Sequence, residues 1–180
     1  LNLQMFLYLF NVCADGSNPY AGVPAGVLYM HAARSVMTVE TKRSAEKDIA
    51  GQEDKAFGMN GIVITNPDCD IPAAMEHDLA GKYIPVRLKK SGVGGSLASL
   101  EQLGLLQRKI EALVADMGNA LQNGQIGQHP VQAKDHDKTC EYCDFASVCA
   151  FKKSVTPRTY DDQTDSAVLA ELEKEGESHA

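Results

Sequence analysis

The sequence has no tryptophan, few other aromatic residues and no long apolar run. Trp is absent from the 180 residues, and aromatic residues make up only 6%. A membrane-spanning helix needs about 20 consecutive apolar residues. The most apolar stretch, the opening LNLQMFLYLFNV, is shorter and is interrupted by Asn2, Gln4 and Asn11. It also lacks the basic flank of a secretory signal. Hydrophobic residues still reach 44%, so the sequence predicts a soluble, cytoplasmic protein with a packed core.

Basic residues are also scarce. The chain has 17 Lys and Arg against 24 Asp and Glu, a net charge of −7. Because DNA-binding surfaces usually carry Lys and Arg that contact phosphates, the total charge argues mildly against nucleic acid. The acidic excess is concentrated, however, in residues 154–180, where two basic and seven acidic side chains account for −5. We predict that this segment is an acidic, disordered tail in which only a weak helix at 166–175 could form. The remaining residues 1–153 are close to neutral.

Hydrophobic periodicity predicts helices alternating with strands. Leu3, Phe6, Leu7 and Phe10 recur at the spacing of one helical face, which predicts a helix over 2–13. Buried or half-buried strands are expected in three segments, 25–31, 59–65 and 83–89. The stretches between them are less regular: a charged connection at 40–57, a short helix or loop at 70–81 and a Gly-rich turn at 91–96. This order is typical of an α/β fold.

The clearest element is an amphipathic helix over 100–122. Ser99 and Gln102 have the spacing of a capping box at its start, and Asn123-Gly124 supplies a stop signal. One apolar stripe runs along it, made of Leu100, Leu103, Leu106, Ile110, Leu113, Met117 and Leu121. Such a stripe predicts that the helix has one apolar face.

Three of the five cysteines crowd into ten residues. Cys140, Cys143 and Cys149 form a C-x2-C-x5-C pattern, in which the first pair can reach one metal from a single tight turn. An odd number of cysteines without a secretory signal argues against a disulfide framework. A zinc site or a cubane cluster needs four ligands, and the triplet supplies three.

Three interpretations of the triplet remain open on spacing alone. It could hold a [4Fe–4S] cluster whose fourth Cys lies upstream of this chain, or a zinc ion with His136 as the fourth ligand. The third interpretation is a set of ordinary reduced cysteines. Cys13 and Cys69 have no ligand partner nearby in the sequence and are expected to be core or loop thiols.

The triplet, with an aromatic residue in each gap and Phe151 after it, resembles the C-terminal signature of RecB-type PD-(D/E)XK nucleases that carry an iron–sulfur cluster. Residues 3–9 are similar to the Q-x3-Y helix of that family, with Gln4 and Tyr8 as its two polar positions. The segments GVLY at 26–29 and GIVI at 61–64 are similar to its next two strands. Within the family, the resemblance is greatest to bacterial ATP-dependent helicase–nucleases of the AddAB type, and it extends over residues 1–153.

The resemblance implies the C-terminal part of a PD-(D/E)XK fold, a mixed sheet flanked by helices. It implies a Mg²⁺-dependent DNA exonuclease subunit that pairs with a helicase–nuclease A subunit to process double-strand breaks for recombinational repair. The Mg²⁺ ligands, the catalytic Lys and the first cluster cysteine should precede Gln4. The chain begins inside a helix-like run without a capping residue, so we interpret it as a piece of a longer protein, inactive alone. Asn66-Pro67-Asp68 reads as a turn, because no acidic-x-Lys strand follows it.

Gln4 and Tyr8 are one helical turn apart and therefore share a face. The resemblance implies that this face looks toward the metal site and the DNA backbone, as an accessory part of the catalytic site. The alternative is that Tyr8 packs in the core and Gln4 is merely solvated. Lys89 and Lys90, at the end of an expected strand, are weak candidates for contact with phosphate, since paired lysines there are more often solvated.

Two other functions stay open. One is a non-enzymatic Cys3His zinc-binding interaction module, which metal identity would distinguish. The other is a CRISPR-associated iron–sulfur nuclease of the Cas4 type, which also has a C-terminal cysteine triplet but is usually shorter between the Q-x3-Y helix and the cysteines.

Overall fold

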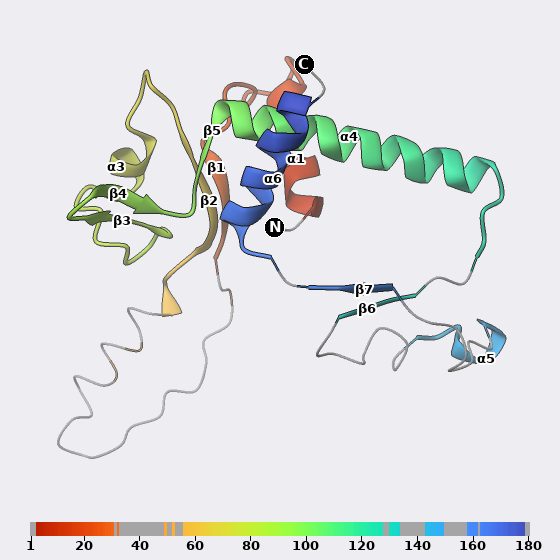
Figure 1. Cartoon of the computed structure of the whole chain (residues 1–180). Coiled ribbons are helices and arrows are strands. Elements are labelled where there is room, and N and C mark those ends of the chain that lie inside the picture. The colour runs from red at the N-terminus through yellow and green to blue at the C-terminus, as the bar shows by residue number, and fades with distance from the viewer. Residues whose placement is uncertain are drawn as a thin grey trace. The chain divides into compact units, whose positions relative to one another are not determined.

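The computed structural model describes residues 3–30, 32, 49, 52, 56–127, 130–133, 143–149, 158–161 and 163–178. The chain divides into two compact units, one made of residues up to 110 together with those from 169 onward, the other of residues 111–168. Helices α4 (Leu100–Gln122) and α6 (Asp165–Ser178) each run from one unit into the other (Figure 1). Most of the charged connection expected at 40–57 lies outside the described residues.

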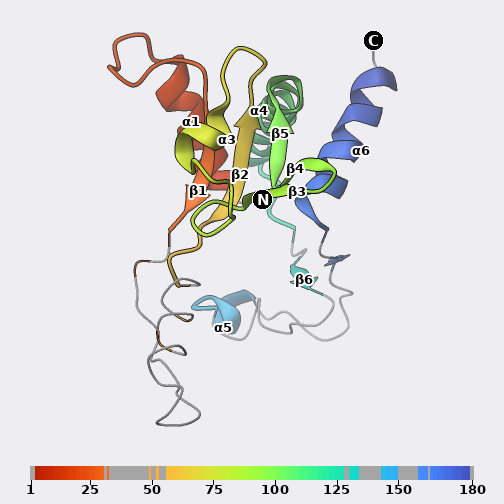
Figure 2. The same ribbon diagram turned by 90° about the vertical axis from the view of Figure 1, so that its left-hand side faces the viewer.

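A three-stranded mixed sheet forms the centre of the first unit. Strand β2 (Asn60–Thr65) lies between β1 (Gly26–Tyr29), to which it is antiparallel, and β5 (Leu97–Ser99), to which it is parallel (Figure 2). The three apolar residues in the middle of β2, Ile62, Val63 and Ile64, are all buried. An unbroken buried run is typical of a central strand covered on both faces. The expected mixed sheet flanked by helices is therefore confirmed.

The Gly-rich turn predicted at 91–96 is wrong for its four central residues, because Gly92–Gly95 form a strand. Strand β4 (Gly92–Gly95) pairs antiparallel with β3 (Val86–Lys89), and only Lys90 and Ser91 make the turn between them. Glycine is a poor strand former, but Gly95 is required here. Its φ is +140°, and a β-carbon on it would lie 2.1 Å from the carbonyl oxygen of Pro85. Close backbone approach, not intrinsic propensity, therefore explains β4.

The hairpin of β3 and β4 is joined to the sheet through a shared core. Val63, Leu79, Ile84 and Val86 form a buried cluster, and partly buried apolar residues pack around it: Leu28, Met59, Ile71 and Leu97. The amide of Ser96 donates to the carbonyl of Pro85 at 2.9 Å, and the amide of Val63 donates to the carbonyl of Ser96 at 3.0 Å. The hairpin is thus held by both apolar burial and backbone hydrogen bonds.

A buried carboxylate holds the loop that leads into β3. Glu76 follows the short helix α3 (Ile71–Met75) and is only 8% exposed. Its two carboxylate oxygens accept the backbone amides of Lys82, Tyr83 and Ile84 at 2.9, 3.0 and 3.1 Å. Burial acts to raise the pKa of Glu76, but the backbone N–H donors outweigh it and hold that pKa below its ordinary value. The carboxylate is therefore a structural brace, which the sequence did not indicate.

Helix α4 begins as the sequence predicts. The amide of Gln102 donates to the Ser99 hydroxyl at 3.0 Å, and the amide of Ser99 donates to the Gln102 side chain at 2.8 Å, so the capping box is confirmed. Gly124 follows the helix with a φ of +66°. Burial along the apolar stripe is uneven. Leu103, Leu106 and Ile110 are buried, whereas three later members are exposed: Leu113, Met117 and Leu121.

The acidic segment 154–180 is more ordered than predicted, because the weak helix expected at 166–175 is the 14-residue helix α6 (Asp165–Ser178). Leu169 and Leu172, three residues apart, are both buried. Contacts at regular spacing join α6 to α4: Gln102 to Glu173 at 2.9 Å, Lys109 to Glu175 at 2.7 Å, and Leu105 against Gly176. Leu169 and Leu172 therefore supply the buried face of the helix, and Glu173 and Glu175 add polar contacts with α4 beside it.

Besides the later part of α4 and the start of α6, the described residues of the second unit form two short strands and one helical turn. Strands β6 (Val131–Ala133) and β7 (Arg158–Tyr160) pair in parallel, and α5 (Ala146–Cys149) is a single helical turn. In the described part of the chain, no helix is long and apolar enough to cross a membrane.

Candidate functional site

Helix α1 (Leu3–Ala14) has one face toward the interior and one toward solvent. Phe6 is buried, and its ring lies 6.2 Å from that of Phe10, one turn further along the same face. Within the helix, the Asn11 side chain donates to the carbonyl of Leu7 at 2.8 Å. The burial of Phe6 sets the rotation of α1 about its axis and therefore decides which side chains remain exposed.

Gln4 and Tyr8 lie on the exposed face and are joined to each other. The Gln4 amide donates to the Tyr8 hydroxyl oxygen at 2.7 Å, and Tyr8 is 54% exposed. The prediction that the two share a face is confirmed, and the alternative that Tyr8 packs in the core is wrong. Because the hydroxyl oxygen already accepts from Gln4, the O–H proton is directed toward another acceptor. The pair is arranged to donate one hydrogen bond outward, as contact with an anionic oxygen requires.

A tight loop follows α1. The Asp15 carboxylate accepts the hydroxyl of Ser17 at 2.6 Å and its amide at 3.0 Å. Both hydrogen bonds lower the pKa of Asp15 below its ordinary value, and the bond from the Ser17 hydroxyl has the larger effect. This carboxylate closes a local turn and shows no arrangement for binding a ligand.

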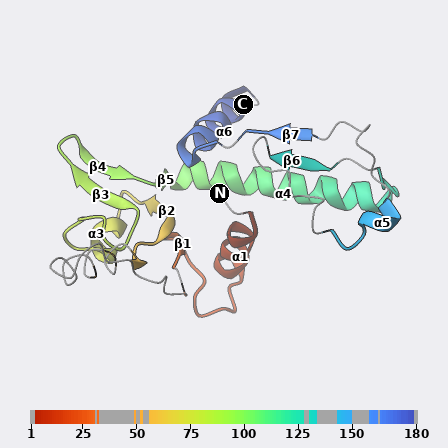
Figure 3. The same cartoon turned by 90° about the horizontal axis from the view of Figure 1, so that it is seen from below.

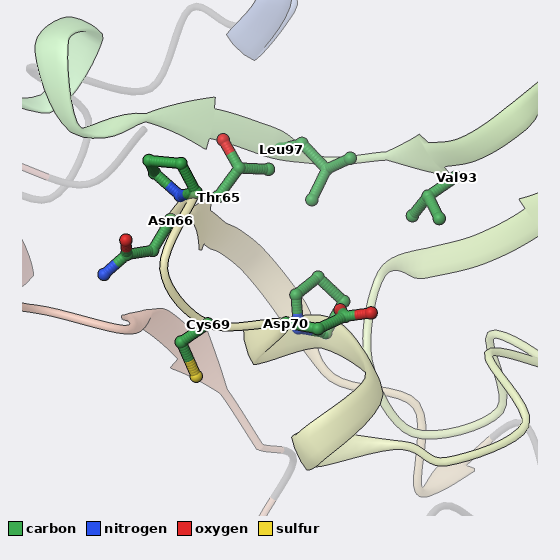
Figure 4. A pocket seen from close by; sticks show the side chains of 8 residues that line it. Thr65, Asn66, Cys69, Asp70, Val93 and Leu97 are labelled. Carbon is green, nitrogen blue, oxygen red and sulfur yellow. The ribbon is translucent and has the colours of Figure 1, made fainter.

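The turn after β2 borders a shallow pocket of about 350 Å³ (Figure 4). Thr65, Leu97 and Val93 lie on the strand side, and Cys69 and Asp70 lie on the side of α3. The polar groups here serve local structure, since Asn66 accepts the amide of Asp68 at 3.0 Å and Asp70 accepts the amide of Ala73 at 3.2 Å as the N-cap of α3. The interpretation of Asn66-Pro67-Asp68 as a turn is confirmed.

Two of the three candidate cluster ligands lie among the described residues. Cys143 is exposed and precedes α5, and Cys149 is half-exposed at its last position. The carbonyl of Phe145 accepts the amides of Val148 and Cys149 at 3.1 and 2.8 Å, so a single hydrogen-bonded turn leads from the segment of Cys143 to Cys149. Cys140 and His136 lie outside the described residues. Among those that the structure does describe, no three His, Cys, Asp or Glu side chains group as a metal site would require.

The two lysines proposed to contact phosphate lie at the tip of the β3–β4 hairpin. Lys89 is the last residue of β3, Lys90 begins the turn, and both are exposed. The sequence interpretation missed Arg87, which is also exposed. The alternation Arg87-x-Lys89 within a strand was the signal, because residues two apart in a strand share a face.

Comparison with known proteins identifies the family. A family model described as the PD-(D/E)XK nuclease superfamily matches residues 1–150. The chain is 30% identical over 188 residues to the B subunit of the ATP-dependent helicase/deoxyribonuclease of Bacillus thuringiensis (strain Al Hakam), a match that covers 97% of this chain and 16% of the relative. The corresponding protein of Oceanobacillus iheyensis is 31% identical over 189 residues, covering 98% of this chain and 16% of the relative. The chain thus spans 16% of the length of these relatives.

Proposed function

This chain belongs to the PD-(D/E)XK nuclease superfamily, and we propose that it forms the C-terminal part of the nuclease domain in the B subunit of a bacterial helicase–nuclease. The complete subunit is a Mg²⁺-dependent DNA exonuclease. With a helicase–nuclease A subunit as its partner, it processes double-strand breaks for recombinational repair. The acidic residues that bind Mg²⁺, and the catalytic Lys, are supplied by residues upstream of Gln4, so these 180 residues alone are inactive.

The Gln4–Tyr8 pair is the observation that carries this proposal. Two polar side chains on an exposed helical face are usually solvated separately, whereas here one orients the other through a 2.7 Å hydrogen bond. A preset donor costs little to reorganise when an anionic group arrives, which is how enzymes stabilise charge on a phosphodiester oxygen. We therefore assign Tyr8 to contact with the DNA backbone beside the cleavage site and Gln4 to positioning Tyr8.

The cysteine triplet fits a metal group by the chemistry of its donors. Thiols three and six residues apart are suited to iron–sulfur clusters and to zinc. Of the described pair, Cys143 is exposed and Cys149 is half-exposed. We propose that Cys140, Cys143 and Cys149 supply three ligands of a [4Fe–4S] cluster and that an upstream Cys supplies the fourth. Such a cluster would tie the end of the nuclease domain to its beginning, a structural role.

The test is to express the gene extended upstream and the present chain, both without oxygen, and to measure degradation of linear duplex DNA with Mg²⁺. We expect the longer protein to degrade DNA and to contain about four irons and four sulfides, and the 180-residue chain to do neither. Mg²⁺-dependent degradation by the 180-residue chain would contradict the upstream placement of the catalytic acids. A single tightly held zinc in that chain, lost on His136→Ala, would instead support the zinc-binding module.

A further inference from the structure

The β3–β4 hairpin and its flanking loops form a cationic region in an acidic chain. Between Leu79 and Leu100 the sequence contains no Asp or Glu, although the chain has a net charge of −7. The same stretch contains four basic residues, Lys82, Arg87, Lys89 and Lys90. Charge of one sign concentrated on a small element gives a local potential that the net charge of a protein does not reveal.

The strand register places the basic residues opposite glycines. Arg87 is paired with Gly94, and Lys89 is paired with Gly92. Because side chains alternate along a strand, these four residues share one face of the ribbon. Val86, on the other face, is completely buried in the core cluster. The face with Arg87 and Lys89, the cationic hairpin face, is thus turned away from the core, and the neighbouring strand adds only bare backbone to it.

The cationic side chains lie across this bare backbone. A β-carbon on Gly94 would lie 3.3 Å from Nζ of Lys89, and a β-carbon on Gly81 would lie 3.0 Å from Cβ of Arg87. Both basic side chains are nevertheless exposed. Figure 3 shows the hairpin at an edge of its unit, on the far side of β5 from α4. A long anionic polymer can therefore approach this face without meeting other side chains of β4.

The nearby acidic groups do not neutralise the face. Glu76 is occupied by three backbone amides, and the Asp78 carboxylate lies 3.0 Å from Nδ1 of His77. Within the part of the chain that the structure describes, no carboxylate forms an ion pair with Arg87, Lys89 or Lys90. Their charge is available to an external partner.

We propose that the cationic hairpin face, together with Lys90 at the turn, binds the sugar–phosphate backbone of DNA independently of sequence. This inference rests on the proposed nuclease function, which makes DNA the relevant polyanion. Flexible Lys and Arg side chains beside an unobstructed backbone suit phosphates, which repeat along the strand. The face is a second DNA contact, separate from Tyr8 and requiring no divalent metal.

The test measures binding of the 180-residue chain to a fluorescein-labelled duplex of about 20 base pairs and to the matching single strand, in EDTA, between about 50 and 200 mM salt. The variant is Lys89→Gln/Lys90→Gln. Its control is Arg108→Gln/Lys174→Gln, which removes the same charge from exposed positions of α4 and α6. Each lost phosphate contact lowers the slope of log affinity against log salt by about 0.9 for duplex and about 0.7 for single strands.

We expect the hairpin variant to lose about 1.8 units of slope on duplex and about 1.4 on single strands, equally for unrelated sequences, while the control keeps the slope of the unmodified chain. Equal losses in variant and control, or no DNA binding by the unmodified chain at low salt, would overturn the proposal. This experiment measures binding and not cleavage. Its failure would therefore not contradict the nuclease function, which the degradation assay tests separately. Conversely, if the longer protein does not cleave DNA but the hairpin still binds it, the nuclease proposal fails and the hairpin proposal stands. Unchanged thermal unfolding verifies that the variant is folded.

Discussion

The side-chain amide of Gln4 donates a 2.7 Å hydrogen bond to the hydroxyl oxygen of Tyr8, one turn further along α1. Both residues are exposed, while Phe6 on the other side of the helix is buried. The burial of Phe6 sets the rotation of α1, and Gln4 then sets the direction in which the Tyr8 hydroxyl can donate. The two residues act as a unit, and their substitutions should be coupled.

Tyr8→Phe in the longer, nuclease-competent protein should lower kcat/KM for DNA degradation by about 10- to 100-fold, since a hydrogen bond to a charged group contributes roughly 1.5–3 kcal/mol. Gln4→Ala should have a smaller effect, and the double variant should be no worse than Tyr8→Phe alone. Steady-state kinetics on linear duplex DNA measure this. Tyr20→Phe, at an 80% exposed position in the loop after α1, is the matched control. Additive effects of the two substitutions would contradict the coupling.

Cys143→Ser or Cys149→Ser in the longer protein, purified without oxygen, should abolish the visible absorbance and the iron content expected of the cluster, because a cubane needs all four thiolate ligands. Cys13→Ser and Cys69→Ser, on α1 and in the turn before α3, should leave both unchanged. Iron and sulfide analysis distinguishes the outcomes. Full iron content in the Cys143 variant would remove that residue from the ligand set.

Glu76→Gln should destabilise the chain at neutral pH by roughly 1.5–3 kcal/mol, because a neutral amide replaces a carboxylate that accepts three backbone amides. The folded-state pKa of Glu76 lies below its ordinary value of 4.5. Its stabilising contribution is therefore complete above the ordinary pKa and is lost as the pH falls through the lowered one. Urea unfolding at neutral pH and at about pH 3 should show the difference from Glu76→Gln shrinking on acidification. Glu171→Gln, at an exposed position, should show neither the loss of stability nor its pH dependence. A difference for Glu76→Gln that does not change with pH would contradict the stabilising role of the ionised carboxylate.

Gly61→Ala should disrupt the pairing of β1 with β2. Gly61 has a φ of +139°, and a β-carbon there would lie 2.0 Å from the carbonyl oxygen of Val27, so the loss of stability should exceed about 1 kcal/mol. Gly118→Ala on α4 is the opposite case, because nothing beyond the backbone of the helix itself lies within 4 Å of the added carbon. It should stabilise the chain by about 0.5–1 kcal/mol through helix propensity. Thermal unfolding of both variants measures these changes in stability. A Gly61→Ala variant as stable as the unmodified chain would contradict the close pairing of β1 with β2 at this position.

Local signals predicted the elements that depend on neighbouring residues. The helices at α1 and α4, the capping box of Ser99 and Gln102, and the turn at Asn66 all involve contacts within four residues along the chain. Such contacts follow from spacing and side-chain chemistry. The strand β2 was also predicted, because a short apolar run that ends at Asn-Pro is typical of a buried strand.

Long-range contacts produced the elements that local patterns did not predict. The Gly-rich strand β4 exists because β3 pairs with it, and α6 is ordered because Leu169 and Leu172 are buried and Glu173 meets Gln102, 71 residues earlier. Propensity and composition count only neighbours in the chain, so they predicted a turn at β4 and no more than a weak helix at α6 within a disordered tail.

The candidate site also combines features that the local sequence predicted with features that only long-range contacts decided. The family, the shared face of Gln4 and Tyr8, and the cysteine spacing could all be read from the sequence, because motif chemistry and helical periodicity are written along the chain. The fold was needed to establish that this face of α1 is exposed, that Gln4 orients Tyr8, and that Arg87 and Lys89 face bare glycine backbone away from the core. Burial and strand register depend on residues distant in sequence, and these are brought together only when the chain folds.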